Sequence, residues 1–236
     1  ALERGVISAQ DRIYCELGAM RYHGHTFNDV HPYAEITFAD VIAHSSNIGM
    51  IKVLSLLQPQ WFYDCIRSFG FGEPTYAGLP GESPGIVHPP SKWSGLSMGA
   101  IPIGQEIGVT SLQLVCAFST IANKGILMRP YVVSDVLSPD GAPLKEFSPQ
   151  VARRVIQPQT AQTLTDMLVR VVSDGTGTAA KIPGYLCAGK TGTQRWRSPP
   201  WPVPRLQPGC SSRFPRGSSP SRTCRESSSG SPAGIP

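Results

Sequence analysis

Residues 38–47 read Phe38-Ala39-Asp40-Val41-Ile42-Ala43-His44-Ser45-Ser46-Asn47, and residues 188–193 read Ala188-Gly189-Lys190-Thr191-Gly192-Thr193. The first stretch predicts a short helix that Thr37 caps, with Asp40 at the capping-box position. Residues 45–47 interrupt that helix, and a second apolar run comes after them. The apolar run from 185 to 188 leads into the second stretch and predicts a strand there. The order and chemistry of these two stretches decide both the fold and the function that we predict.

The Lys190-Thr191-Gly192-Thr193 segment has the composition of an anion-binding strand. Lys190 supplies a positive charge, and the hydroxyls of Thr191 and Thr193 stand at alternate positions, which place them on one face of a strand. Gly192 allows close approach of a substrate backbone. Such a strand suits a ligand that ends in a carboxylate. Taken alone, the same four residues are also typical of a polar turn with an exposed lysine.

The Ser45-Ser46-Asn47 segment is less specific when it is taken alone. Serine and asparagine favour caps and turns, so the triplet is typical of any break between two helices. A functional interpretation requires the side chains of Ser45 and Asn47 to project into a cleft. The weight of this triplet therefore depends on the motifs that occur further along the chain.

The rest of the chain predicts a mixture of helices and strands, which is an α/β (α+β) fold. Gly and Pro are frequent between residues 70 and 108, where we expect a long surface loop. We expect the helix that Thr110 and Gln113 cap to be largely buried, because its apolar residues wrap more than one face. The expected elements are helices over 48–54, from 59 to about 70, from 110 to 125 and from 158 to 175, a strand over 131–137 and a turn at 138–141.

The charge of the chain is unevenly distributed. The formal net charge is +5, but residues 194–236 contain seven Arg and one acidic residue, Glu226. The remaining 193 residues are nearly neutral, so we predict no nucleic-acid binding. The six cysteines show no Cys-x-x-Cys spacing, which argues against zinc. Cys65, Cys116 and Cys187 stand among apolar neighbours and are expected to be buried thiols.

The character of the sequence changes at Gln194. Residues 194–236 contain nine Pro and ten Ser, with few apolar residues. Such a segment cannot bury enough surface to offset the entropy of ordering it, so we predict that it is disordered. The abrupt change to an Arg-, Pro-, Ser- and Gly-rich composition also suggests a reading-frame shift after Thr193, and a genuine disordered tail is the alternative.

The two motifs in this order resemble class B penicillin-binding proteins, in which Ser-x-Asn precedes Lys-Thr-Gly and an upstream Ser-x-x-Lys supplies the nucleophile. Other segments extend the resemblance over residues 1–193. They are Phe38–Asn47, Gly104-Gln105-Glu106-Ile107-Gly108-Val109-Thr110-Ser111-Leu112-Gln113-Leu114, Ile121-Ala122-Asn123-Lys124-Gly125 and Asp174-Gly175-Thr176-Gly177-Thr178-Ala179-Ala180. The resemblance implies a penicillin-binding, β-lactamase-like transpeptidase fold, with a partial transpeptidase domain over 1–193 that is incomplete at both ends.

The resemblance also implies a reaction. Such enzymes crosslink peptidoglycan: a serine attacks the D-Ala-D-Ala bond of a stem peptide, and an amine resolves the acyl-enzyme. Ser45 would relay a proton to the leaving amine, and Asn47 would hold the substrate amide and the lysine of the Ser-x-x-Lys motif. Lys190 would bind the terminal carboxylate with Thr191 and Thr193 and assist Ser45. Gly192 would admit the substrate, and the Thr193 N–H would be an oxyanion-hole donor.

The implied partners are peptidoglycan stem peptides, β-lactams and other cell-wall synthesis proteins, with no cofactor and no metal. The longer protein would lie at the outer face of the cytoplasmic membrane, held by an anchor outside this chain. Two alternatives stay open. One is a β-lactamase or D,D-carboxypeptidase relative, which the 145-residue separation of Ser45 from Lys190 and the 104–114 segment disfavour. The other is a non-catalytic penicillin-binding sensor.

We expect the 236-residue chain to resist covalent labelling by a fluorescent penicillin. The sequence contains no Ser-x-x-Lys, and the resemblance of residues 1–7 to the far end of the nucleophile helix places that motif several residues upstream of Ala1. Gel fluorescence after incubation with the labelled drug measures the acylation. The control is the same chain extended upstream through a Ser-x-x-Lys motif. A covalent adduct on the 236-residue chain would contradict the prediction.

Overall fold

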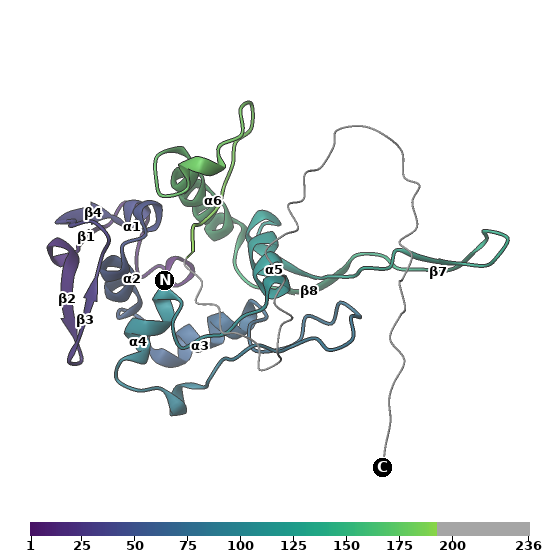
Figure 1. The fold of residues 1–236 in the computed structure, drawn as a ribbon, viewed down its shortest axis with the longest axis horizontal. Helices are drawn as coiled ribbons and strands as arrows, with labels where there is room; N and C mark the ends of the chain where they lie inside the picture. Colours follow the sequence, from purple (N-terminus) through teal and green to yellow (C-terminus); the bar gives the residue numbers. More distant parts are fainter. Residues whose placement is uncertain (193–236) are drawn as a thin grey trace, which may run out of the picture. The chain divides into compact units, whose positions relative to one another are not determined.

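The computed structural model of this protein describes residues 1–192, and helices and short antiparallel strands alternate along them (Figure 1). Thr193 and the predicted tail at 194–236 lie outside the described residues. The elements are β1 (Arg12–Tyr14), β2 (Ala19–Tyr22), β3 (His25–Asn28), β4 (Glu35–Thr37), α1 (Phe38–His44), α2 (Asn47–Leu54), α3 (Pro59–Ser68), α4 (Ser97–Ala100), α5 (Ser111–Ala122), β5 (Ile126–Arg129), β6 (Asp135–Leu137), β7 (Pro143–Glu146), β8 (Gln150–Arg154) and α6 (Pro158–Ser173).

The strands form four antiparallel pairs, which are β1–β4, β2–β3, β5–β8 and β6–β7. The last two pairs lie one after the other along a single ribbon that leaves α5 and returns to α6 (Figure 1). The predicted turn at 138–141 closes this ribbon, with the Gly141 N–H donating to the Ser138 carbonyl at 2.9 Å. The strand that we expected over 131–137 is shorter than predicted, because only Asp135–Leu137 pairs with β7.

The break between α1 and α2 falls where the sequence predicts it. Thr37 caps α1, and Asp40 completes the capping box by accepting from the Thr37 backbone. Ser45 ends α1 in the left-handed region, with φ 58° and ψ 43°. Ser46 then caps α2, because its Oγ accepts the Gly49 N–H at 2.9 Å. Only two residues therefore separate the two helices, and the turn between them carries the Ser45-Ser46-Asn47 segment, which is called the first motif below.

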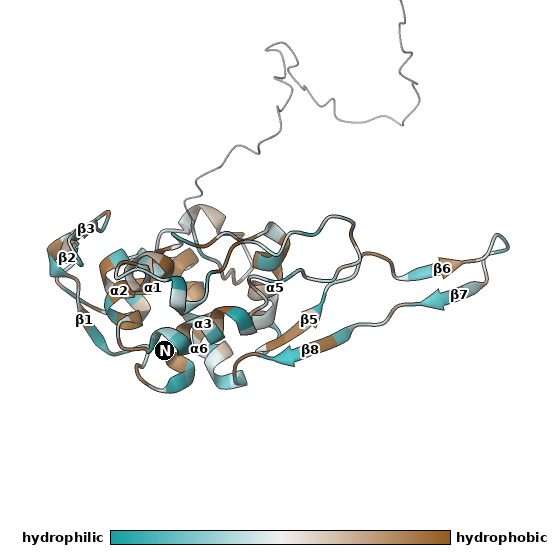
Figure 2. Cartoon of the chain, turned by 90° about the horizontal axis from the view of Figure 1, so that it is seen from below, coloured by the Kyte–Doolittle hydropathy of each residue, from teal (hydrophilic) through white to brown (hydrophobic). Residues whose placement is uncertain are grey.

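The core lies under α1 and α2, and Figure 2 shows hydrophobic residues concentrated in these helices and in β5. Ile48 and Val41 are fully buried there, and Met167 reaches the same core from α6. Burying a side chain of this size contributes about 2 kcal/mol. The rest of the cluster is Ile7, Ile13, Cys15, Phe38, Ala39, Val53, Leu54 and Leu57. The core thus anchors the helix pair that presents the first motif.

Helix α1 lies against the C-terminal end of α6 and the residues that follow it. Arg170 Nη2 donates to Asp40 Oδ1 at 2.5 Å, and the Thr176 N–H donates to the Ala43 carbonyl at 3.0 Å. A Cβ atom on Gly175 would lie 2.3 Å from the Ala43 oxygen, so glycine is required at this position. Burial on its own raises the pKa of Asp40, but the Thr37 hydrogen bonds and the Arg170 charge outweigh it and hold this pKa below its usual range.

Gln113 fixes the long loop that the sequence predicts over 70–108. It completes the capping box of α5, and its amide is almost fully buried. Its Nε2 donates to the carbonyls of Glu73 and Pro84 at 2.8 and 2.9 Å. These bonds satisfy backbone acceptors in a segment that has little regular structure of its own.

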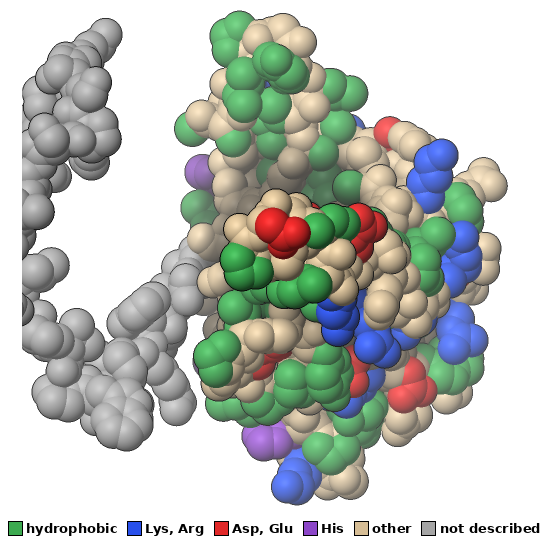
Figure 3. Space-filling view, turned by 90° about the vertical axis from the view of Figure 1, so that its right-hand side faces the viewer, with side chains coloured by type: hydrophobic (Ala, Val, Ile, Leu, Met, Phe, Trp, Pro, Cys, Tyr) green, Lys and Arg blue, Asp and Glu red, His purple; other side chains and the backbone are tan. Residues whose placement is uncertain are grey.

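The expectation that α5 is largely buried is wrong for the described residues. Leu114, Val115 and Phe118 are 43%, 60% and 42% exposed. The described residues pack on α5 from the side of β5 and α6, so the apolar side chains on its other faces meet solvent. Apolar side chains are also exposed along the ribbon, and Figure 3 shows hydrophobic side chains between the charged ones on the face that it presents.

The strand predicted over 185–188 and into Lys190 is also absent from the described residues. A strand requires a hydrogen-bonded neighbour, and no described strand pairs with this segment. Its Gly189 N–H instead donates to the Leu168 carbonyl of α6 at 3.2 Å. Residues 185–192 therefore run as irregular backbone against α6.

The prediction that three cysteines are buried thiols is wrong for all three. Cys65 is exposed, and Cys116 and Cys187 are intermediate, whereas Cys15 is the fully buried thiol. Cys65 lies outside the buried part of α3, where Ile66 is the buried residue. All four are free thiols. Among the described residues, no helix combines the length and the apolar character that crossing a membrane requires.

We predict that the substitution Gly175→Ala lowers the free energy of unfolding by about 2 kcal/mol, since the added Cβ forces the ends of α1 and α6 apart. Urea unfolding followed by circular dichroism measures this change. The matched control is Gly189→Ala, whose Cβ would lie 3.7 Å from Val172, an ordinary contact. Equal stability of the two variants would show that the close approach to Ala43 is not needed.

Candidate active site

The backbone conformation of Ser45 determines the direction in which its side chain leaves the turn. Ser45 is a non-glycine residue in the left-handed region, which costs about 1 kcal/mol or more. Such strain persists only where the surroundings hold it, and it is frequent at active sites. Here the backbone N–H groups of Ser45 and Ser46 donate back to the carbonyls of Ile42 and Val41. The turn therefore exposes the Ser45 side chain at the end of α1.

The tertiary structure brings Lys190 to Ser45 across 145 residues of sequence. Lys190 Nζ donates to Ser45 Oγ in a short hydrogen bond and to the Thr191 carbonyl at 3.1 Å. The two motifs therefore meet at one place, through the Lys190 ammonium and the Ser45 hydroxyl.

Thr176 joins the same group, although sequence reasoning assigned it no role in the site. Its Oγ1 lies 2.7 Å from Thr191 Oγ1 and 3.4 Å from Ser45 Oγ. The only signal in the sequence was its place in the 174–180 segment. Its position depends on the contact between the ends of α1 and α6, which no local pattern predicts.

The charge of Lys190 is not neutralised by a carboxylate among the described residues. The ion pairs among these residues all use other cations; for example, Arg170 pairs with Asp40 and Arg153 pairs with Glu73. The loss of water around the Lys190 ammonium lowers its pKa. A lysine in this position favours an anionic ligand, which would replace the missing counter-charge.

Asn47 does not contact Ser45 or Lys190 by a hydrogen bond in the described structure. Its Nδ2 donates instead to the Asn28 carbonyl at 2.8 Å, at the end of β3. This bond fixes the amide and leaves Oδ1 without a protein donor among the described residues. Asn47 can therefore accept a hydrogen bond from a ligand or from a cation.

Asp29 holds the first motif on the side that faces the core, and sequence reasoning missed it. Its Oδ2 accepts from Ser46 Oγ at 2.6 Å, and its Oδ1 accepts the Ile48 N–H at 3.0 Å. The carboxylate therefore sits at the N-terminus of α2, where a negative charge is favourable. Ser46 is 1% exposed, and Cys15 Sγ lies 3.4 Å from its Oγ. Asp29 thus holds the middle residue of the motif, while its neighbour Asn28 holds Asn47.

Gly192 has open space on its side-chain face, since no described atom would lie within 4 Å of an added Cβ. Backbone at this point is accessible to a ligand. The predicted role of Thr193 lies outside the described residues. Among the residues that the structure describes, no group of three or more His, Cys, Asp or Glu could hold a metal ion.

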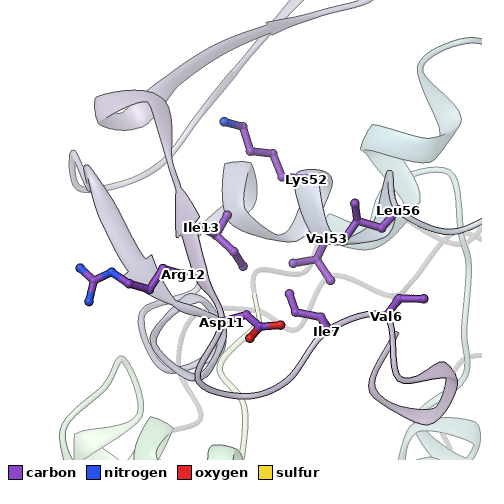
Figure 4. A pocket seen from close by; sticks show the side chains of 8 residues that line it. All are labelled: Val6, Ile7, Asp11, Arg12, Ile13, Lys52, Val53 and Leu56. Carbon is purple, nitrogen blue, oxygen red and sulfur yellow. The ribbon is translucent and has the colours of Figure 1, made fainter.

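Two surface pockets lie outside this constellation of side chains. The pocket in Figure 4 has a volume of about 310 Å³, and Ile7, Ile13 and Val53 point into it while Arg12 points away. None of the site residues lines it. A second pocket of about 380 Å³ lies between α6 and residues 181–187, and it is lined mainly by apolar side chains.

The side chains at the site form a hydroxyl cluster beside an uncompensated ammonium. Ser45, Thr176 and Thr191 each carry one donor and two acceptor positions, and Lys190 carries donors only. This combination can bind a carboxylate and can hold a hydroxyl proton for transfer. The site contains no histidine or carboxylate that could serve as a general base, so Lys190 is its only strong acid–base group in the described part of the chain.

A family model, the penicillin binding protein transpeptidase domain, matches residues 1–199. Penicillin-binding protein PbpB of Mycobacterium tuberculosis is 36% identical over 222 residues, which is 90% of this chain and 31% of that protein. Peptidoglycan D,D-transpeptidase FtsI of Escherichia coli is 32% identical over 196 residues, which is 83% of this chain and 31% of that protein. The chain spans about a third of the length of these relatives.

The crystal structure of penicillin-binding protein 3 from Mycobacterium tuberculosis superimposes with a TM-score of 0.76 and is 36% identical, covering 84% of this chain and 46% of that one. The same protein has been solved in complex with aztreonam and with ampicillin. The described fold is therefore the mixed α/β fold of these domains.

We predict that Asp29→Ala lowers the free energy of unfolding by about 2 kcal/mol, because two bonds to a charged acceptor are lost and the buried Ser46 hydroxyl keeps only the weak acceptor Cys15 Sγ. Thermal or urea unfolding measures the change. Asp11→Ala is the matched control, since the Asp11 carboxylate is exposed and bonds only the nearby Ser8. A similar loss in both variants would argue against a specific support of α2.

Proposed function

Because this chain belongs to the family of penicillin-binding protein transpeptidase domains, we propose that its described residues form the carboxylate-binding and proton-delivering side of a peptidoglycan D,D-transpeptidase site. The observation that carries the proposal is the contact of Lys190 with Ser45, which joins the two motifs. The lack of a carboxylate partner for Lys190 among the described residues supports an anionic ligand.

The proposed reaction is an acyl transfer in two steps. A serine hydroxyl attacks the carbonyl of the D-Ala-D-Ala bond, the bond to the terminal D-Ala breaks, and the free D-Ala leaves as an amine that has taken up a proton. An amine of a second stem peptide then attacks the acyl-enzyme and releases the serine. The nucleophile belongs to a Ser-x-x-Lys motif, which these 236 residues do not contain.

Ser45 is the proposed proton donor to the leaving amine. Its hydroxyl accepts from the Lys190 ammonium, so its own hydrogen is available for donation. Once Ser45 has given up that hydrogen, the ammonium can replace it. The lowered pKa of Lys190 makes this second transfer easier, because a less basic amine releases its proton more readily.

The remaining roles concern substrate binding. Lys190, Thr191 and Thr193 are proposed to bind the terminal carboxylate of the stem peptide, and the open face of Gly192 would admit its backbone. Asn47 would accept from the substrate amide N–H or from the lysine of the Ser-x-x-Lys motif with its Oδ1. The Thr193 N–H is proposed as an oxyanion-hole donor.

β-Lactams are the second ligand class that we propose, because they carry an anionic group, a carboxylate or a sulfonate, beside a strained amide. The complexes of the Mycobacterium tuberculosis relative with aztreonam and ampicillin support this assignment. We also propose that the protein works at the outer face of the cytoplasmic membrane with other cell-wall synthesis proteins, as its cell-wall relatives suggest.

The carboxylate site can be tested without the nucleophile. We predict that the chain binds an acetylated peptide ending in D-Ala-D-Ala more tightly than the same peptide with a C-terminal amide, by about tenfold. Lys190→Met should abolish this preference, because it removes the one charged side chain among the described residues of the site. An NMR titration of each peptide into the labelled chain measures both affinities.

Lys181→Met is the matched control, since Lys181 is an exposed lysine of the preceding loop and contacts none of the site hydroxyls. It should leave the acid-to-amide ratio unchanged. Equal affinities of the acid and the amide for the unsubstituted chain would overturn the proposed site.

The preference of the chain for the acid peptide over the amide peptide should also depend on pH. Binding needs the protonated Lys190, and burial lowers the pKa of that group, so the acid-to-amide ratio should fall as the pH rises through this lowered pKa. An ordinary lysine loses its charge only near pH 10.4. The titration repeated between pH 7 and pH 10.5 checks the sign, and a ratio that stays constant until the ordinary lysine pKa would contradict it.

A further inference from the structure

Thr176 lies at the centre of the site, and the proposed reaction gives it no role. Its Oγ1 lies 2.7 Å from Thr191 Oγ1 and 3.4 Å from Ser45 Oγ. Its backbone is held independently of both contacts, because the N–H donates to the Ala43 carbonyl at 3.0 Å. Thr176 therefore stands between the hydroxyl that delivers a proton and the hydroxyl that binds the carboxylate.

The donors and acceptors of these groups set the direction of the bonds at one end. An ammonium has hydrogens to donate and no lone pair to accept with, so Ser45 Oγ accepts from Lys190. The hydrogen of Ser45 is then available, and Thr176 Oγ1 lies within reach as an acceptor.

A bound carboxylate sets the direction at the other end. An ionised carboxylate accepts only, so Thr191 must donate its single hydroxyl hydrogen to it. The 2.7 Å contact between the two threonine hydroxyls can then exist only as a bond that Thr176 donates. Without a ligand, the Thr176 hydrogen has a second acceptor, the Ala43 carbonyl at 3.4 Å.

We propose that Thr176 is a positioning residue that links Lys190, Ser45 and Thr191 into one directed chain of hydrogen bonds when a carboxylate is bound. Groups in such a chain polarise one another, so each bond strengthens the next. Carboxylate binding at Thr191 is thereby coupled to the Ser45 hydroxyl, whose hydrogen Thr176 Oγ1 accepts until the leaving amine takes it. This inference rests on the proposed function, because the carboxylate is the ligand that directs the chain.

A purely structural role for Thr176 predicts something different. The loop is fixed to α1 by the Thr176 backbone N–H and by the close approach of Gly175, and neither contact needs the hydroxyl. Replacing the hydroxyl by a methyl group in Thr176→Val keeps the shape and both contacts. A change in ligand preference on this substitution is therefore a property of the hydroxyl alone.

The experiment compares the acid-to-amide affinity ratio of the acetylated D-Ala-D-Ala peptide in the full chain and in its variants. Thr176→Val should lower the ratio by about fivefold, the effect of losing one hydrogen bond. Thr176→Ser, which keeps the hydroxyl, should restore it. Thr178→Val is the matched control from the same loop, because the Thr178 side chain makes no hydrogen bond to a described residue, and it should leave the ratio unchanged.

A double-mutant cycle with Thr191→Val tests whether Thr176 changes the acid-to-amide ratio through Thr191. If Thr176 acts through Thr191, adding Thr176→Val to the Thr191→Val chain should change the ratio by less than about twofold. Additive effects of the two substitutions would overturn the proposed chain, as would an unchanged ratio in Thr176→Val.

The outcomes separate this inference from the proposed function. If the unsubstituted chain does not prefer the acid, the proposed carboxylate site is wrong. If the preference is present and Thr176→Val leaves it unchanged, only the proposed role of Thr176 is wrong. The dispersion of the NMR spectrum shows whether each variant is folded. If the valine variant does not fold, Thr176→Ala, whose smaller side chain needs less space, gives the same comparison against Thr176→Ser.

Discussion

The close approach of Gly175 to the Ala43 carbonyl is the constraint on which the site depends. A side chain at residue 175 would collide with that oxygen, and only with glycine can the Thr176 N–H reach it at 3.0 Å. This contact ties the end of α6 to the end of α1. Ser45 lies close by on one side and Thr176 directly on the other, so a single backbone contact fixes the spacing of two of the hydroxyls. The salt bridge between Arg170 and Asp40 supports the same junction one turn away.

The first motif is held by different means on its two sides. Toward the core, Asp29 accepts from Ser46 and from the N-terminus of α2, so the middle serine serves the structure and not the ligand. Toward the surface, Ser45 sits in a strained left-handed conformation that presents its hydroxyl to Lys190. The division gives each of the three polar residues of this segment a separate use. Only the outer two, Ser45 and Asn47, have side chains available for chemistry.

Electrostatics separate Lys190 from the other cations near the core. Arg170 and Lys52 each lie against a carboxylate, so their charges are compensated within the described fold. Lys190 has hydroxyl and carbonyl acceptors alone, which stabilise a proton without cancelling the charge. A group of this kind attracts an anion and also gives up a proton more readily than a fully hydrated lysine. These two properties are what carboxylate binding and proton delivery require from one residue.

The sequence by itself determined the features that depend on neighbours three or four residues apart. Thr37 with Asp40 and Thr110 with Gln113 form the predicted capping boxes, and the break at Ser45–Asn47 falls as expected, because caps and turns are local interactions. The two motifs and their order also came from sequence, and with them the family. Only the tertiary structure decided what depends on distant partners: that Thr176 and Asp29 belong to the site, that the segment before Lys190 is not a strand in the described part, and that α5 leaves Val115 exposed. A strand exists only with a paired neighbour and a helix face is buried only against a partner, and neither partner can be read from the segment itself.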